Sequence, residues 1–170
     1  MMKHICTLTD KVILNRDGLS NALPRLTARA IVRNNHGLYA VMYAEKWNLY
    51  SLPGGGIEDG EDVETALRRE IFEETGCSCD IIQELGIVSE NRASLDYTQI
   101  NHYFIVSVST PPCRNHLTDA EQACGTQVQW HSFEKMQNLI CNQHFDRIQG
   151  KYLQARDVAA LNAYLTQFTE

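Results

Sequence analysis

The chain has 170 residues and a formal net charge of −6 at pH 7. This length predicts one domain with a core of its own. The segment from Glu58 to Glu74 holds eight acidic residues against two arginines, so the rest of the chain is formally neutral. Because no basic stripe is present, the composition argues against sequence-independent binding to duplex nucleic acid.

The six cysteines are scattered, and they are Cys6, Cys77, Cys79, Cys113, Cys124 and Cys141. Cys77 and Cys79 stand too close for an ordinary bridge within one strand, and no second pair completes a zinc pattern. The N-terminus lacks the apolar run of a signal peptide or a membrane span. We therefore expect a protein of the reducing cytoplasm that contacts no membrane and uses its thiols mainly as core filler.

Strand signals dominate the N-terminal part of the chain. Residues 4–14 alternate weakly and predict an edge strand or a hairpin, and residues 15–24 are turn-rich. Leu26 to Arg33 predicts a strand with alternating buried positions. Asn34 to Gly37 is typical of a hairpin turn, because Asn and Gly tolerate positive φ, and Leu38 to Tyr43 is the expected return strand.

A helix is predicted from Glu61 to Thr75, after a glycine segment at Gly54 to Gly56. Gly76 is a natural helix stop. Glycines let the backbone approach a bulky anion or a metal closely. The helix carries an apolar stripe at four-residue steps, made of Val63, Leu67 and Ile71.

The second half predicts more strands and two helices. Ser78 to Val88 is expected to form a strand pair or one long bent strand, followed by a polar loop from Ser89 to Gln99. Ile100 to Val108 predicts a strand, Thr110 to Gly125 a long polar loop, and Thr126 to His131 a short strand.

The C-terminal region predicts two amphipathic helices. Ser132 is expected to cap a helix over Phe133 to Cys141. A second helix is expected over Asp157 to Phe168, as part of a helical addition at 153–168.

Three glutamates of the first predicted helix stand at offsets of three and four, which places Glu70, Glu73 and Glu74 on one face. Like charges so placed repel, and the last helical turn favours cations. A divalent cation would relieve the repulsion, and carboxylate oxygens suit Mg²⁺ or Mn²⁺. From charge alone, a solvated acidic face remains an equal alternative.

The full spacing resembles the Nudix box over Gly55 to Cys77. The matching positions are Gly55, Glu61, Arg69, Glu70, Ile71, Glu73, Glu74 and Gly76. The last position of the box, usually aliphatic, is Cys77 here, and a buried thiol is a small apolar group with little expected consequence.

This resemblance implies an α+β fold, the Nudix-type α/β/α sandwich with a mixed β-sheet, plus an extra C-terminal helix. We expect a single domain over residues 1–170 with a core at about 26–140. The N-terminal strand or hairpin at 1–24 and the helix at 153–168 would be additions, and the helix would cover an edge or form a homodimer contact.

The resemblance also implies a reaction, the Mg²⁺-dependent attack of water at phosphorus in a diphosphate linkage, with Mn²⁺ as the other candidate metal. The expected substrate is a small nucleoside diphosphate derivative of the nucleotide or nucleotide-sugar class. Glu70, Glu73 and Glu74 would be metal ligands, with the carbonyl of Gly54 or Gly55 completing the set. Glu70 is a candidate to orient or deprotonate the water, and the identity of the base stays open.

Further candidates lie outside the helix. The resemblance implies an additional carboxylate from the long loop, and Glu121 is the first choice, with Glu90 as a rival. It also implies an ion pair between Glu61 and Arg69 that holds the loop to the helix.

Substrate contacts are predicted from residues near the box. Trp47 and Tyr50 are candidates to stack on a base, although aromatic packing is the common role of such residues. Arg29 and Arg92 are candidates for phosphate contacts, and Gly55 for close backbone approach to the substrate.

Two other functions are compatible with this fold. A non-catalytic Nudix-like module that binds a nucleotide or metabolite is the main alternative, and the intact glutamate triad argues against it. A diphosphate-isoprenoid isomerase would need a cysteine and a glutamate fixed in the cleft, and nothing in the sequence places Cys113 or Cys124 there.

Overall fold

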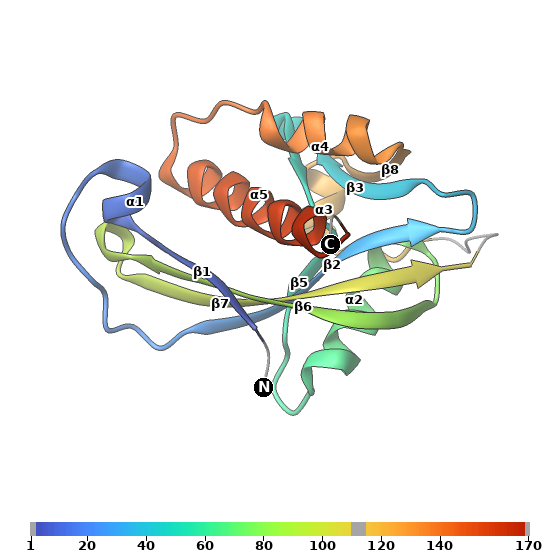
Figure 1. The fold of residues 1–170 in the computed structure, drawn as a ribbon, viewed down its shortest axis with the longest axis horizontal. Helices are drawn as coiled ribbons and strands as arrows, with labels where there is room; N and C mark the ends of the chain where they lie inside the picture. Colours follow the sequence, from blue (N-terminus) through green and yellow to red (C-terminus); the bar gives the residue numbers. More distant parts are fainter. Residues whose placement is uncertain (1–2, 110–114, 169–170) are drawn as a thin grey trace.

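The computed structural model describes residues 3–109 and 115–168. Within these ranges, eight strands form one mixed sheet with helices on both faces (Figure 1). The first half comprises β1 (His4–Thr9), α1 (Asp10–Leu14), β2 (Arg25–Asn34), β3 (Tyr39–Ala44), the 3₁₀ turn η1 (Glu45–Trp47), β4 (Leu49–Ser51), β5 (Gly54–Gly56) and α2 (Val63–Thr75). The second half comprises β6 (Cys79–Arg92), the 3₁₀ turn η2 (Ala93–Leu95), β7 (Tyr97–Val108), α3 (Asp119–Ala123), β8 (Thr126–His131), α4 (Phe133–Cys141) and α5 (Ile148–Phe168).

The strand order is β1-β6-β7-β2-β3-β4, with β5 paired to β2 and β8 paired to β3. The pairs β1–β6 and β2–β7 are parallel, and the other pairs are antiparallel. Strand β2 is central: Arg29 lies opposite Gly54 on one side and opposite Tyr103 on the other. The glycine segment is therefore fixed to the middle of the sheet.

Alternation along β2 sends side chains to two different cores. On one face, Ala28, Ala30 and Val32 pack under α2, whose buried residues include Leu67 and Ile71. On the other face, α4 and α5 cover a cluster made of residues such as Ile31, Tyr103, Met136, Ile140 and Leu161. The layers are those of the expected α+β sandwich, and α5 covers a sheet face, whereas the homodimer contact stays a prediction.

Helix boundaries agree closely with their capping signals. Helix α2 begins at Val63, two residues after the predicted start, because Asp62 is the N-cap and accepts a hydrogen bond from the Thr65 amide at 2.8 Å. It ends at Thr75, and Gly76 is its C-cap, with a φ of 71°. Ser132 caps α4 as predicted.

The predicted polar loop at residues 89–99 is wrong. Strand β6 continues to Arg92 and β7 begins at Tyr97, with only η2 and Asp96 between them. Three of the polar side chains of this stretch, Glu90, Arg92 and Gln99, are buried, and Glu90 accepts hydrogen bonds from Arg92 and Asn101. A polar stretch can therefore lie inside the protein when its groups are mutually satisfied.

Other elements differ in extent. Residues 4–14 form the edge strand β1, one of the two expected alternatives, followed by the short helix α1. Residues 79–88 belong to one long strand, the second of the two alternatives for that stretch. The long loop contains α3, and α5 begins at Ile148, well before the predicted start. The loop residue Cys113 lies outside the described ranges. None of the described helices is long and apolar enough to cross a membrane.

Candidate active site

The glycine segment contacts the glutamate helix directly. The backbone amide of Gly54 donates to Oε2 of Glu74 at 2.7 Å. Gly54 has a φ of 125°, and a Cβ there would stand 2.2 Å from the carbonyl oxygen of Ala28. Only glycine fits this position, because both the backbone conformation and the space exclude a side chain.

Glu74 is buried, with 6% of its surface exposed. Burial raises the pKa of this carboxyl well above its usual value, and the charge of Glu70 acts in the same direction. The hydrogen bond from Gly54 opposes these effects only in part. The site therefore holds a carboxylate that lacks full compensation from the protein.

Arg69 holds the loop and the helix together. It forms two bonds to Glu61, Nε to Oε1 at 2.8 Å and Nη2 to Oε2 at 2.9 Å, and it also donates to the carbonyl of Gly56 at 2.9 Å. The hydrogen bond from Arg69 lowers the pKa of Glu61 to about 2. This geometry confirms the predicted ion pair and gives it a paired, fork-like form.

The same guanidinium reaches two of the predicted metal ligands. Its Nη1 donates to Glu70 at 2.9 Å and to Glu73 at 3.4 Å. Glu70 lies against the backbone of Gly55, where a Cβ would stand 2.5 Å from its carboxylate. Burial raises the pKa of Glu70, and the charge of Glu73 adds to the effect, although Arg69 opposes it.

Helix α3 places the charge of Glu121 close enough to Glu70 and Glu74 to affect both carboxyl groups. The charge of Glu121 contributes to the raised pKa of both Glu70 and Glu74. The preceding segment is tied to α2, because the His116 amide donates to the carbonyl of Glu73 at 2.7 Å. Glu121 itself accepts from the amide and hydroxyl of Thr118 in a capping box.

The donor set suits a hard cation, but it is not assembled around a common centre. Within residues 3–109 and 115–168, no three histidine, cysteine, aspartate or glutamate side chains are grouped so as to hold a metal ion. Glu70 and Glu73 share Arg69, and Glu74 bonds to Gly54. The chemistry of the oxygens fits Mg²⁺ or Mn²⁺, and binding would exchange contacts to Arg69 for contacts to the metal.

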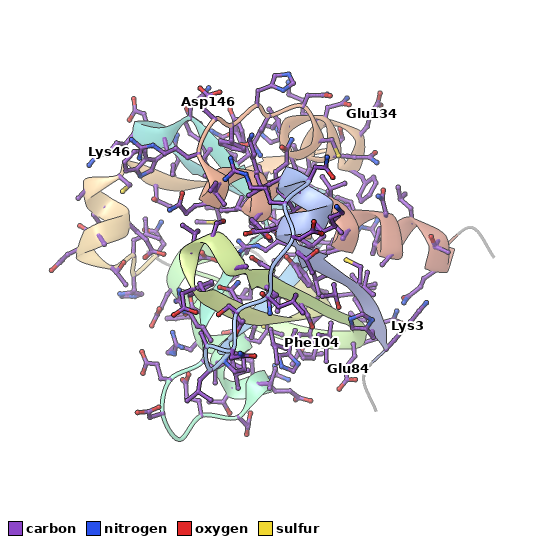
Figure 2. The ribbon with its side chains drawn as sticks, turned by 90° about the vertical axis from the view of Figure 1, so that its left-hand side faces the viewer. Lys3, Lys46, Glu84, Phe104, Glu134 and Asp146 are labelled. Atoms are coloured by element: carbon purple, nitrogen blue, oxygen red, sulfur yellow. The ribbon has the colours of Figure 1, made fainter. Side chains whose placement is uncertain are left out.

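The two aromatic candidates lie in different surroundings. Trp47 is 48% exposed, and the side chains of Lys46 and Arg147 lie over its ring at 5.2 and 5.3 Å from the centroid. These residues line an open pocket of about 780 Å³ between η1 and the start of α5. Figure 2 shows two of its lining residues, Lys46 and Asp146, at the upper end of the molecule, away from Glu84. Tyr50 instead stacks on Tyr43, with ring centroids 4.6 Å apart.

The two arginine candidates face protein groups. Arg29 donates from Nη1 to the carbonyls of Gly54 at 2.9 Å and Leu52 at 3.4 Å, and its buried Nε has no hydrogen-bond partner among the described residues. Arg92 is buried and pairs with Glu90, whose side chain is fully buried. The suggestions that Glu90 supplies a catalytic carboxylate and that Arg92 grips phosphate are therefore corrected, because each neutralises the other inside the protein.

The sequence reasoning missed a buried polar group on α5. Asp157 is fully buried and accepts hydrogen bonds from the hydroxyl of Tyr103 and the backbone amide of Leu52. Its signal was present, because Asp157 stands four residues before Leu161 on the face that packs against the sheet. A charged residue within an apolar face indicates a specific partner.

Comparisons with known proteins agree with this geometry. The NUDIX domain family model matches residues 23–150, well over half of the chain. Among curated relatives, the RNA pyrophosphohydrolase of Vibrio vulnificus is 36% identical over 75 residues, which cover 43% of this chain and 41% of the relative. The RNA pyrophosphohydrolase of Shewanella frigidimarina is 33% identical over 91 residues, or 52% of this chain and 49% of the relative. The chain thus spans less than half the length of these relatives.

Solved structures share the fold. A NUDIX hydrolase from Nitrosomonas europaea superposes with a TM-score of 0.64 at 19% identity, covering 85% of this chain and 90% of that one. A UDP-X diphosphatase superposes with a TM-score of 0.57 at 15% identity, covering 87% of this chain and 66% of that one. These superpositions show the fold, and the match of the family model over residues 23–150 shows that the chain belongs to the Nudix hydrolase family.

Proposed function

We propose that this protein is a divalent-metal-dependent pyrophosphohydrolase that cleaves the diphosphate linkage of a nucleoside diphosphate derivative. The observation that carries the proposal is the contact of two acids with the glycine segment: the buried Glu74 with Gly54, and the partly buried Glu70 with Gly55. Crowded carboxylates in a low-dielectric site are costly unless a cation compensates them. The site is therefore suited to bind a metal together with an anionic substrate.

The proposed ligands are Glu70, Glu73 and Glu74. The carbonyl of Gly54 already accepts from Arg29, so we favour Gly55 as the additional backbone oxygen. When bound, the metal would neutralise phosphate charge and lower the pKa of water. The contacts of Glu74 with Gly54 and of Glu70 with Gly55 keep both acids beside the glycine segment.

The reaction adds the oxygen of water to phosphorus and breaks the bridging P–O bond, whose electron pair leaves with the departing phosphate. Glu70 and Glu121 are the candidates to accept the proton of the attacking water. The pKa of Glu70 is raised by burial, which brings this carboxylate closer to the range in which a base works at neutral pH. The charge of Glu121, on α3, also raises the pKa of Glu70.

We propose that the nucleoside part of the substrate lies toward the pocket at Trp47. Turn η1 borders the end of α3, because the Lys46 amide donates to the carbonyl of Cys124 at 3.0 Å. An exposed indole with two neighbouring cations suits a base attached to phosphates. Tyr50 and Arg29 remain further proposed contacts. The names of the curated relatives make the 5′ end of RNA a substrate to test beside free nucleotides and nucleotide sugars.

The test is a substrate panel assayed with Mg²⁺, with Mn²⁺ and with chelator. We expect product release only with metal. We expect Glu73→Gln and Glu74→Gln each to lower turnover by about 100-fold or more without unfolding the protein. Glu64→Gln, on an exposed residue in the first turn of the same helix, is the matched control and should retain activity.

Thermal unfolding supplies a second measurement. Glu74→Gln should raise the melting temperature in metal-free buffer, because it removes a buried charge that lacks compensation. Mg²⁺ should raise the melting temperature of the wild type more than that of the variant. Wild-type turnover in both Glu73→Gln and Glu74→Gln would overturn the proposal, whereas nucleotide binding without product would favour the non-catalytic module.

A further inference from the structure

Asp157 is a fully buried carboxylate in the middle of α5. Its Oδ2 accepts from the amide of Leu52 at 2.9 Å, and its Oδ1 accepts from the Tyr103 hydroxyl at 2.5 Å and from Nε of Arg156 at 3.2 Å. A buried ion pair often adds less stability than apolar residues of the same volume. Packing alone therefore does not explain a charge at this position.

The partner of Asp157 belongs to the segment Leu52–Gly54, which directly precedes the Nudix box. Strand β4 ends at Ser51 and β5 begins at Gly54, so the segment crosses between two strands. Every backbone donor and acceptor of the segment is nevertheless paired. The pairs are Leu52 N with Asp157, Leu52 O with Arg29, Pro53 O with the Ala30 amide, Gly54 N with Glu74, and Gly54 O with Arg29.

The two N–H groups of this segment are held by carboxylates from opposite layers. Pro53 has no N–H, so Leu52 and Gly54 supply the only amide donors. Asp157 binds the first from α5, and Glu74 binds the second from α2. These two helices lie on opposite faces of the sheet (Figure 1). A change at Asp157 would therefore shift Leu52 and, two residues further along the chain, disturb the hydrogen bond between Gly54 and Glu74.

We propose that Asp157 is a positioning residue that sets the segment Leu52–Gly54 at the distance Glu74 requires. This inference rests on the proposed function, in which Glu74 is a metal ligand. Asp157 acts through the backbone and touches neither metal nor substrate. The C-terminal helix thereby becomes part of the catalytic apparatus in addition to being a cover for the sheet.

The experiment compares Asp157→Ala and Asp157→Asn with Tyr152→Phe. Tyr152 is also buried on α5, and its hydroxyl bonds to Asp10 and to the Asn91 carbonyl, away from the segment. At a temperature well below unfolding, we expect Asp157→Ala to lower kcat by on the order of 10- to 100-fold with a smaller change in KM, because a small misplacement of catalytic groups is costly. Asp157→Asn keeps an oxygen for the Leu52 amide and should recover part of that loss. Tyr152→Phe should keep the wild-type kcat.

Two readouts need no turnover. Hydrogen exchange of the Gly54 amide in metal-free protein should accelerate by about tenfold or more in Asp157→Ala, because the segment opens locally. Titration of Mn²⁺, followed by electron paramagnetic resonance without substrate, should show weaker binding in Asp157→Ala than in Tyr152→Phe. A residue that only stabilised the fold would move neither quantity relative to this control.

The outcomes separate the two proposals. Wild-type activity and its loss in Glu73→Gln test the proposed function, whereas Gly54 exchange tests the positioning alone. The inference is overturned when folded Asp157→Ala matches Tyr152→Phe in kcat and in Gly54 exchange. If Asp157→Ala does not fold, Asp157→Asn and Tyr103→Phe replace it in the same measurements, because Tyr103→Phe removes one hydrogen-bond donor to the Asp157 carboxylate. The inference is then refuted if both variants match Tyr152→Phe in kcat and in Gly54 exchange.

Discussion

At the scale of single residues, the candidate site depends on how closely a backbone can approach a carboxylate. Glu70 occupies the space that a side chain at Gly55 would need, and Arg69 holds it there. The neighbouring Gly56 faces a different group, because a Cβ there would stand 2.9 Å from Nη2 of Arg25. Gly55 thus leaves space for the Glu70 carboxylate, whereas Gly56 leaves space for the Arg25 guanidinium.

We predict that Gly55→Ala lowers turnover by about 10- to 100-fold while the protein stays folded. The added methyl would meet the end of the flexible Glu70 side chain, so Glu70 turns away and the backbone need not move. Gly56→Ala displaces only Arg25 and serves as the control. Steady-state kinetics and a melting curve for each variant test this, and equal kcat values for the two would contradict it.

At the scale of elements, strand β5 can pair with β2 only because Gly54 has no side chain. A Cβ at Gly54 would stand 2.2 Å from the Ala28 oxygen and 2.6 Å from Cα of Arg29, and backbone cannot give way as a side-chain end can. Gly60 also has a positive φ, 86°, but apart from its chain neighbours no described residue has an atom within 4 Å of its Cβ position. A comparison of Gly54 with Gly60 therefore distinguishes the cost of a steric clash from the cost of a positive φ alone.

We expect Gly54→Ala to destabilise the protein by more than about 3 kcal/mol, the range of the most disruptive substitutions. Gly60→Ala should cost only about 1–2 kcal/mol, the usual penalty for a left-handed residue with a side chain. Urea unfolding measures both free energies. A similar loss in the two variants would show that strain, and not the contact between β5 and β2, sets the requirement.

At the scale of the whole molecule, Asp10 connects segments far apart in the chain. Its carboxylate accepts from the Ser94 amide at 2.7 Å and from the Tyr152 hydroxyl at 2.7 Å. The N-terminal helix, the turn η2 and the C-terminal helix therefore meet at one buried acid. Burial by itself would raise the pKa of Asp10, but the hydrogen bonds from Ser94 and Tyr152 outweigh burial, and the pKa is lowered.

The sign of the pH dependence follows from this lowered pKa. Asp10 contributes stability above the pKa of the unfolded chain, about 3.9, and the contribution is lost as pH falls through the lower folded value. Asp10→Asn should therefore unfold more easily at pH 7, by about 1–3 kcal/mol, and approach the wild type below about pH 4. Asp17→Asn, in an exposed pair with Lys11, should change little. A difference between Asp10→Asn and the wild type that does not vary with pH would contradict this.

Local patterns predicted the parts of this protein that depend on neighbours in the chain. Helix α2 followed from its apolar stripe and its glycine stop, and the ion pair of Glu61 with Arg69 followed from the resemblance to the Nudix box. The predicted strands at Leu26 to Arg33 and Leu38 to Tyr43 are confirmed as β2 and β3, because the alternation and the turn residues that indicate them are also local in the chain. The loop prediction for residues 89–99 is wrong because polar residues need not be exposed: Glu90 and Arg92 satisfy each other inside the protein.

The sequence alone determined the family, the sandwich and the face that carries Glu70, Glu73 and Glu74, because spacing within one helix encodes which side chains share a face. Only the tertiary structure decided that the charge of Glu121 raises the pKa of Glu70 and Glu74, and that Asp157 binds the Leu52 amide, 105 residues away. Such pairings depend on how distant segments pack: the position of Asp157 on an apolar helix face indicates a buried charge, but it does not identify the group that satisfies this charge.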